Sequence, residues 1–159
     1  MRSDLVEFQK KFRIPELSIH KTAHWRWSVR SSHCTLGSGI LSLKRYAERL
    51  SDITPDEGSD LSHITKVIED TLKLVFNYDK LNYLMLMMVD QHVHFHVVPR
   101  YSRAIEFAGL TWTDKGWPAL PDLSAPQYET SILVAVKNKL VNELQMTGIA
   151  AASRNDLTR

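Results

Sequence analysis

The stretch that most constrains the fold is residues 91–100, which read QHVHFHVVPR. It places three histidines at every second position: His92, His94 and His96. Side chains of a β-strand point alternately to the two faces of a sheet, so the three imidazoles share one face. The apolar residues between them are predicted to pack in the core: Val93, Phe95 and Val97. The histidines are therefore expected on an open or cleft-facing surface.

The chain of 159 residues has the length and composition of one globular domain, with 43% hydrophobic and 24% charged residues. Its net charge of +2 gives no reason to expect a nucleic-acid partner. Cys34 is the only cysteine, which excludes an internal disulfide and fits a reducing compartment. The N-terminus has no apolar signal region, and no apolar run approaches the roughly 20 residues of a membrane span. These features predict a cytoplasmic protein without a membrane partner.

Periodicity and turn signals predict an α+β fold, with helices packed on one mainly antiparallel sheet. Helices are expected at residues 3–12, 55–77 and about 125–145. Strands are expected at residues 17–20, 24–30, 40–43, 82–89 and 92–98. Pro99 is expected to end the last strand, and Asp90-Gln91 alone is expected to link the last two. Residues 102–123 contain Trp112 and Trp117 and are predicted to be irregular.

Two of these segments carry the clearest local signals. Thr54 is a good N-cap for the second helix, because Pro55 follows it and Glu57 stands three residues later. In the strand at 24–30 the residues alternate between a core face and a polar face. The core face holds Trp25, Trp27 and Val29, and the polar face holds His24, Arg26, Ser28 and Arg30. His20, His33 and His63 form no cluster with other residues and are expected at the surface.

Three interpretations of the histidine strand compete. The first is a solvent-exposed strand face whose histidines have no catalytic or binding role. The regular spacing of three titratable groups argues against this interpretation. The second is a metal site, in which two of the histidines share an ion with Asp90 or His24. His92 and His96 would lie about 13 Å apart along a strand, so all three imidazoles could bind one ion only if the strand were strongly bent. The third is nucleophilic attack by the neutral middle imidazole, with its neighbours binding anionic oxygens, which suits chemistry at phosphorus.

The run HVHFHVV at residues 92–98 resembles the signature of the histidine triad (HIT) superfamily. The resemblance extends to the TPDE helix start at 54–57, to DKLN at 79–82 and to Pro99-Arg100, and it covers roughly residues 20–102. It implies a five-stranded HIT-like α+β fold, a homodimer and a nucleotide substrate. It also implies hydrolysis or nucleotidyl transfer at the α-phosphorus of nucleoside phosphoramidates or dinucleoside polyphosphates. The reaction passes through a nucleotidyl-histidine intermediate and needs no cofactor or metal.

Carried over by this resemblance, His94 is the nucleophile. The predicted substrate- and phosphate-binding residues are His92, His96, Arg30, Ser38 and Asn82. The sequence departs from the family pattern at three points. Ser38 stands for a fourth histidine, Arg30 for an acidic or amide residue that contacts ribose, and Asp90-Gln91 for a longer phosphate-binding loop.

The chain is expected to form a single domain over residues 1–159. Its core spans about 17–102, an aromatic loop and helix follow at about 103–147, and a mobile tail occupies 148–159. Two other functions remain open at this point. One is a nucleotide-binding module with little catalysis, and the other is a metal-dependent hydrolase that uses two of the histidines.

Overall fold

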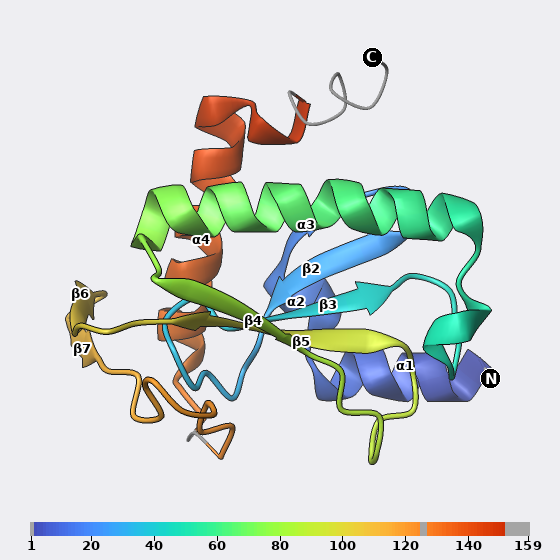
Figure 1. Ribbon diagram of the computed structural model, residues 1–159, viewed down its shortest axis with the longest axis horizontal. Helices are drawn as coiled ribbons and strands as arrows, with labels where there is room; N and C mark the ends of the chain where they lie inside the picture. The colour runs from blue at the N-terminus through green and yellow to red at the C-terminus, as the bar shows by residue number, and fades with distance from the viewer. Residues whose placement is uncertain (1, 125–126, 152–159) are drawn as a thin grey trace.

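A computed structural model describes residues 2–124 and 127–151 of the chain. A five-stranded antiparallel sheet with strand order β1-β2-β3-β5-β4 forms its centre (Figure 1). The strands are β1 (Ser18–Lys21), β2 (Trp25–Val29), β3 (Gly39–Leu43), β4 (Lys80–Leu84) and β5 (His94–Arg100). The helices are α1 (Arg2–Lys11), α2 (Ile14–Leu17), the 3-10 turn η1 (Leu50–Asp52), α3 (Pro55–Phe76) and α4 (Thr130–Thr147). The predicted fold class is confirmed.

Helix α3 begins and ends as its sequence predicts. The Thr54 hydroxyl accepts a hydrogen bond from the Glu57 amide at 3.2 Å, and the Glu57 carboxylate accepts one from the Thr54 amide at 2.8 Å. This capping box satisfies two amides that have no partner inside the helix. Asn77 ends the helix in the left-handed conformation at a φ of 50°.

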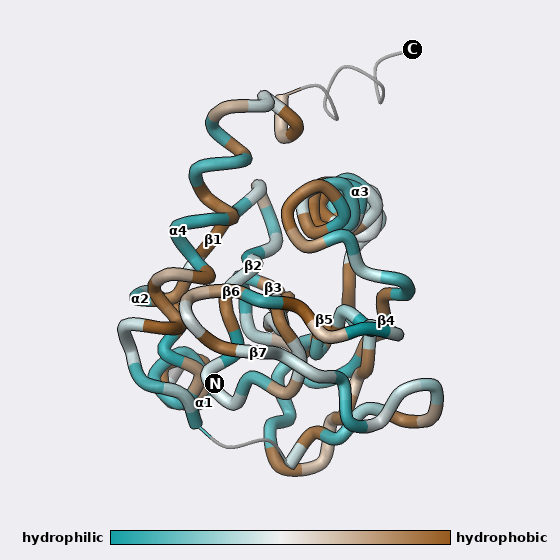
Figure 2. The backbone as a smooth tube through the Cα atoms, turned by 90° about the vertical axis from the view of Figure 1, so that its left-hand side faces the viewer, coloured by the Kyte–Doolittle hydropathy of each residue, from teal (hydrophilic) through white to brown (hydrophobic). Residues whose placement is uncertain are grey.

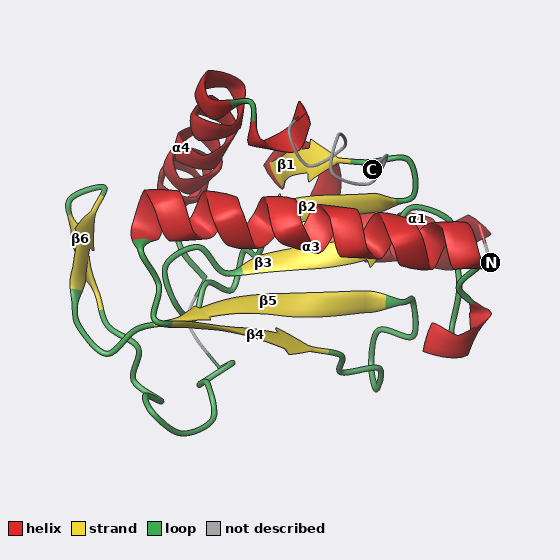
Figure 3. Cartoon of the chain, turned by 45° about the horizontal axis from the view of Figure 1, so that its top comes forward, coloured by secondary structure: helices red, strands yellow, loops and turns green. Residues whose placement is uncertain are grey.

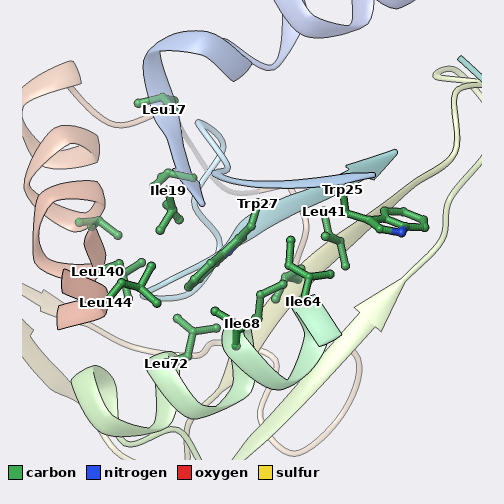
Figure 4. Close-up of a cluster of buried hydrophobic side chains, with 14 of the residues drawn as sticks. Leu17, Ile19, Trp25, Trp27, Leu41, Ile64, Ile68, Leu72, Leu140 and Leu144 are labelled. Atoms are coloured by element: carbon green, nitrogen blue, oxygen red, sulfur yellow. The ribbon is translucent and has the colours of Figure 1, made fainter. Parts of the chain in front are cut away.

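The main core lies between one face of the sheet and the helices α3 and α4. The sheet contributes Trp25, Trp27 and Leu41, and α3 contributes Ile64, Ile68 and Leu72 (Figure 4). Leu140 and Leu144 of α4 close one side of this cluster. Val93 and Val97 are fully buried on the same face, and Phe95 packs against the cluster. The predicted core faces of β2 and β5 are therefore confirmed.

Helix α1 lies on the opposite side of the sheet from α3. Figure 2 looks along α3 and shows α1 on the far side of the strands, and Figure 3 shows α3 in front of the sheet, running along its strands. A second, smaller apolar cluster forms under α1 from Phe8, Phe12, Ile14 and Ile40. Because Ile40 pairs with His96 across β3 and β5, this cluster lies on the histidine face. Both faces of the central strands are thus covered by helix.

The strand expected at 82–89 is wrong at its C-terminal end. β4 ends at Leu84, and residues 85–93 form a nine-residue loop before β5. Several of its apolar side chains face solvent, with exposed fractions of 49% for Leu86, 87% for Met88 and 80% for Val89. An unbroken apolar run usually indicates a buried strand. Here the residues after Leu84 leave the sheet and form a loop, so the expected strand is too long. The prediction that Asp90-Gln91 alone connects the last two strands is likewise wrong, because residues 85–93 connect them.

The histidine strand is also shifted from its expected position. β5 begins at His94 and runs through Pro99 to Arg100, so Pro99 does not end it. β3 pairs with β5 only as far as Val97, and beyond that point β4 is the only strand paired with β5. A proline is tolerated there because its missing amide proton is not needed for a second ladder.

The C-terminal part adds a hairpin and a helix. β6 (Ile105–Phe107) and β7 (Leu110–Trp112) pair within the segment that was expected to be irregular. Helix α4 starts at Thr130, later than expected, and residues 125–126 and 152–159 of the predicted helix and tail lie outside the described residues. Trp112 is buried and stacks on Tyr128 with 4.8 Å between ring centroids. No helix in the described ranges is long and apolar enough to cross a membrane.

Candidate active site

The three histidines gather on one face, as their spacing predicts, but that face is closed. His94 and His96 lie on β5 opposite Ser42 and Ile40 of β3, and His92 precedes the strand. Their exposed fractions are 2% for His92, 0% for His94 and 7% for His96. The expectation of an open or cleft-facing surface is therefore wrong for this conformation.

Helix α1 provides the cover. The ring of Phe8 lies 4.9 Å from that of His92 and 5.1 Å from that of His94, between centroids. Phe12 lies 5.8 Å from the His94 ring and 6.3 Å from the His96 ring. Helix 3–12 was predicted to have apolar contacts, but its sequence carries no signal of where those contacts fall. The covering role of Phe8 and Phe12 was missed for this reason.

His94 is fixed in one tautomer by a local contact. Its Nδ1 lies 2.6 Å from the backbone oxygen of His92. A carbonyl oxygen can only accept, so Nδ1 carries the proton and the neutral ring has its lone pair on Nε2. Nε2 is buried and has no hydrogen-bond partner among the described residues. The ring therefore offers a desolvated, unshared lone pair, which is the requirement for a nucleophile.

The ring of His92 is committed elsewhere. Its Nε2 donates to the Leu43 carbonyl at 2.8 Å, and its Nδ1 accepts from the Ala47 amide at 3.4 Å. Tyr46 stacks on the ring at 5.5 Å between centroids. With both nitrogens occupied, His92 positions its own backbone oxygen for His94. Tyr46 was not identified from the sequence, because it stands outside any motif.

The same bonding bears on the metal interpretation. A zinc ligand needs an imidazole nitrogen with a free lone pair, and His92 uses both of its nitrogens. Across residues 2–124 and 127–151, no three His, Cys, Asp or Glu side chains are grouped so that they could hold a metal ion. The geometry favours a nucleophile over a shared metal ligand.

Burial keeps all three imidazoles neutral. Desolvation is the largest cause that lowers the pKa of His92 and of His94, and hydrogen bonds to backbone carbonyls oppose it. The pKa of His96 falls to about 4, because desolvation is joined by the nearby positive charge of Arg30. The lowered pKa of His94 favours its neutral form, which is the form able to attack.

Two cavities flank α1 and reach the outer histidines. The Tyr46 cavity, of about 450 Å³, is lined by Asp4, Glu7, Phe8, Lys11, Tyr46, Glu48, Val89, Asp90, Gln91 and His92. The Arg30 cavity, of about 370 Å³, is lined by Lys11, Phe12, Arg30, Ser31, Ser32, Leu86, Met88, Val89, Asp90, His96 and Gln127. Lys11 and Asp90 belong to both, and their side chains bond at 2.8 Å. His94 lines neither cavity, so α1 and this ion pair separate its attacking nitrogen from both.

The structure places Arg30 beside the triad but keeps Ser38 and Asn82 apart. Ser38 is buried, and its hydroxyl donates to the Thr35 carbonyl at 2.7 Å and accepts from the Thr35 amide at 3.1 Å. Asn82 lies on β4, where its side-chain oxygen accepts from Arg100 at 2.9 Å. Arg100 in turn pairs with the buried Asp114 at 2.7 Å. Neither Ser38 nor Asn82 lines the Tyr46 cavity or the Arg30 cavity.

Two of the histidines expected at the surface are buried. His33 has an exposed fraction of 1%, and its Nδ1 donates to the Arg30 carbonyl at 3.0 Å while its Nε2 accepts from the Gly37 amide at 2.9 Å. Desolvation lowers its pKa to about 4. His63 is 6% exposed. Solitary histidines carry no periodic signal, so burial by tertiary packing could not be predicted for either.

Comparison with protein families gives one match to this part of the chain. Residues 40–103 match the model of the HIT domain, a segment that runs from β3 through the three histidines to the end of β5. None of the curated proteins matches the sequence.

Solved structures share the fold at low identity. A hypothetical histidine triad nucleotide-binding protein from Sulfolobus tokodaii has a TM-score of 0.66 at 12% identity, over 91% of this chain and 92% of that one. A Hit-like protein involved in cell-cycle regulation from Bartonella henselae has a TM-score of 0.62 at 17% identity, over 87% and 95%. A histidine triad protein from Sinorhizobium meliloti has a TM-score of 0.62 at 16% identity, over 83% and 93%.

Proposed function

The chain is a HIT-domain protein, and on that premise we propose that it is a nucleotide hydrolase or nucleotidyl transferase acting at an α-phosphorus. The observation that carries the proposal is the state of His94. Its Nδ1 proton is held by the His92 carbonyl, and its Nε2 lone pair is buried and unshared within the described part of the chain. The substrate class is a nucleoside phosphoramidate or a dinucleoside polyphosphate.

In the first step Nε2 of His94 attacks the α-phosphorus, and the bond from phosphorus to the leaving nitrogen or oxygen breaks. The leaving group takes the bonding electrons and a proton from solvent. The nucleotidyl-imidazolium that forms is positively charged, and the His92 carbonyl 2.6 Å from Nδ1 stabilises that charge. Water, or another acceptor, then attacks phosphorus and releases a proton to solvent. The N–P bond breaks, its electrons return to Nε2 and His94 is again neutral.

The neighbouring residues have different roles in this scheme. His96 has a buried Nδ1 without a partner in the described ranges, and it lines the Arg30 cavity, so its ring is available to bind phosphoryl oxygens. His92 holds and orients His94 through its backbone oxygen. We leave Ser38 and Asn82 out of the substrate contacts, because hydrogen bonds within the protein occupy the Ser38 hydroxyl and the Asn82 side-chain oxygen.

Replacement of His94 tests the reaction. Wild-type protein incubated with adenosine 5′-phosphoramidate or a diadenosine polyphosphate should release the nucleoside monophosphate, and acid-free mass spectrometry should find a nucleotidyl group on the peptide containing His94. His94→Ala should abolish both signals while circular dichroism shows an unchanged fold. Turnover at the wild-type rate by His94→Ala would exclude this mechanism.

One observation favours a second function, a nucleotide-binding module with little catalysis. His94 has no exposed surface in this conformation, because α1 covers it. If α1 does not move, a nucleotide can enter the flanking cavities but cannot reach Nε2. Nucleotide binding by calorimetry without any adduct on His94 would support this alternative over the hydrolase.

We also propose that the protein is a homodimer whose sheets join along β4. β4 is an edge strand that pairs with β5 on one side, and Leu86 and Met88 expose apolar surface just beyond it. Light scattering should give twice the chain mass, and Leu86→Asp should shift the mass toward the monomer. Leu120→Asp, at an 84% exposed apolar site in the C-terminal loop, serves as the matched control. A monomeric wild-type protein would refute the dimer.

A further inference from the structure

Arg30 carries a positive charge that no ion pair with a described residue compensates. The residue follows β2 and is partly buried. One of its terminal nitrogens donates to the Ser32 carbonyl, and its Nε is buried with no acceptor among the described residues. No carboxylate within residues 2–124 and 127–151 pairs with it. Partial burial of an unpaired charge is unfavourable, so a site that keeps one is well suited to an anionic ligand.

The surroundings of Arg30 form a cavity rather than a gap in packing. Its lining includes Phe12 and His96, together with Leu86 and Met88 of the loop before β5. Its volume of about 370 Å³ falls within the range of small-molecule sites. Lys11 and Asp90 also line it, but they neutralise each other at 2.8 Å. Arg30 therefore gives the cavity a net positive charge.

The Tyr46 cavity, which α1 also lines, has the opposite character. Its lining includes Glu7 and Glu48, besides the neutralised pair of Lys11 and Asp90. The two cavities share that pair, so they lie next to each other along the histidine face. A substrate that spans both has its negative charge attracted to the Arg30 end and repelled from the Tyr46 end.

We propose that the Arg30 cavity binds a second anionic group of the substrate, separate from the phosphoryl group that His94 attacks, and so sets the direction in which the substrate lies. This inference rests on the proposed function. The preferred substrate is then a nucleotide with two phosphate positions, and a phosphoramidate with an uncharged leaving amine is a poorer one. Two sources supply the same chemistry: a phosphate on the ribose, or the polyphosphate chain of the leaving group.

Calorimetric binding of three ligands separates these sources: adenosine 5′-monophosphate, adenosine 3′,5′-bisphosphate and adenosine 5′-diphosphate, each repeated in the guanosine series. In the wild-type protein a second phosphate should tighten binding at least tenfold over the monophosphate. An advantage of the bisphosphate places the anion on the ribose, and an advantage of the diphosphate places it on the leaving group. Equal affinity for all three ligands would overturn the inference.

Substitution of Arg30 tests whether the tighter binding of ligands with a second phosphate depends on the Arg30 cavity. Arg30→Gln should abolish the advantage of the second phosphate, taken as the ratio of the two affinities within the same variant, whereas Arg30→Lys should keep part of the advantage. Arg49→Gln is the matched control, because Arg49 is exposed, pairs with Asp52 and lines neither cavity. If the advantage survives in Arg30→Gln, the inference is wrong.

The outcome is distinguishable from failure of the proposed function. An adduct on His94 with no preference for a second phosphate would leave the hydrolase in place and remove the Arg30 subsite. An Arg30-dependent preference without any adduct would keep the subsite and remove the hydrolase. Thermal unfolding of each variant confirms that binding is compared between folded proteins.

Discussion

The two faces of the central sheet are both buried, yet they are built for different purposes. The face toward α3 is mostly apolar and contains Trp27, Leu41 and Val97 without exposed surface, although the Trp27 Nε1 also lacks a hydrogen-bond partner among the described residues. The face toward α1 is equally dry but holds His94 and His96, each with a buried nitrogen that lacks a partner in the described ranges. A buried polar atom without a hydrogen bond costs free energy, whereas a buried methyl group provides it. The first face stabilises the fold, and the second keeps reactive groups dehydrated at some expense in stability.

Matched alanine substitutions on the two faces should give the largest contrast. His94→Ala should reduce turnover at least about 1,000-fold, since removal of a nucleophile removes the covalent path. Leu41→Ala should lower the free energy of unfolding by about 3 kcal/mol, because it leaves a cavity in the core, and turnover per folded molecule should stay within a factor of two. Denaturant unfolding and steady-state kinetics measure both variants. Comparable loss of turnover in the two would abolish the distinction between the faces.

Acid should lower the stability of the folded protein through the histidine face, because the side chains of the apolar face do not titrate. The pKa of His96 is lowered to about 4, so the folded protein takes up this proton only below about pH 4, while the unfolded chain takes it up near 6.5. Stability is therefore complete above pH 6.5 and is lost as the pH falls toward 4. His33, which packs against Trp112 and Tyr128, adds a contribution of the same sign.

His96→Gln tests this linkage. Denaturant unfolding at pH 7 and pH 4.5 should show a smaller loss in the variant than in the wild-type protein, by up to about 3 kcal/mol. His33→Gln gives the comparison with a histidine outside the site. Equal acid sensitivity of His96→Gln and wild type would mean that His96 is not buried as a neutral ring.

The cover over His94 can be probed chemically. Phe12→Ala removes one of the two rings that shield the imidazole. Modification of His94 by diethyl pyrocarbonate, followed by peptide mass mapping, should become about tenfold faster in this variant, because the reagent needs access to Nε2. Phe76→Ala, which opens the apolar core instead, should leave that rate near the wild-type value in molecules that remain folded.

The smallest expected effect concerns the ion pair of Lys11 and Asp90, which ties α1 to the loop before β5. Lys11 is about half exposed, with a side-chain fraction of 51%, so the pair contributes at most about 1 kcal/mol. Lys11→Met should raise the modification rate of His94 by up to about fivefold, and added salt should reproduce part of that increase in the wild-type protein. A rate independent of both would show that the pair does not hold α1 closed.

Local patterns in the sequence determined much of the structure. The alternation in QHVHFHVVPR set which side chains face the core, and Thr54 with Glu57 set the start of α3. These features depend on neighbours in the chain, where periodicity and capping act directly. The HIT resemblance rested on the same short-range patterns, and the family match at 40–103 agrees with it.

Tertiary structure decided how the site is closed and charged. The ring of Phe8 packs against that of His94 although the two residues lie far apart in the sequence. No local pattern predicts which face of the sheet an amphipathic helix will cover. The apolar run after Leu84 leaves the sheet as a loop, and Pro99 stays inside β5 because β3 pairs no further than Val97. The sequence by itself determined that one imidazole would be flanked by two others. Only packing decided that this imidazole would be buried and neutral, with a positive cavity on one side and an acidic cavity on the other, because burial and electrostatic fields arise from residues brought together by the fold.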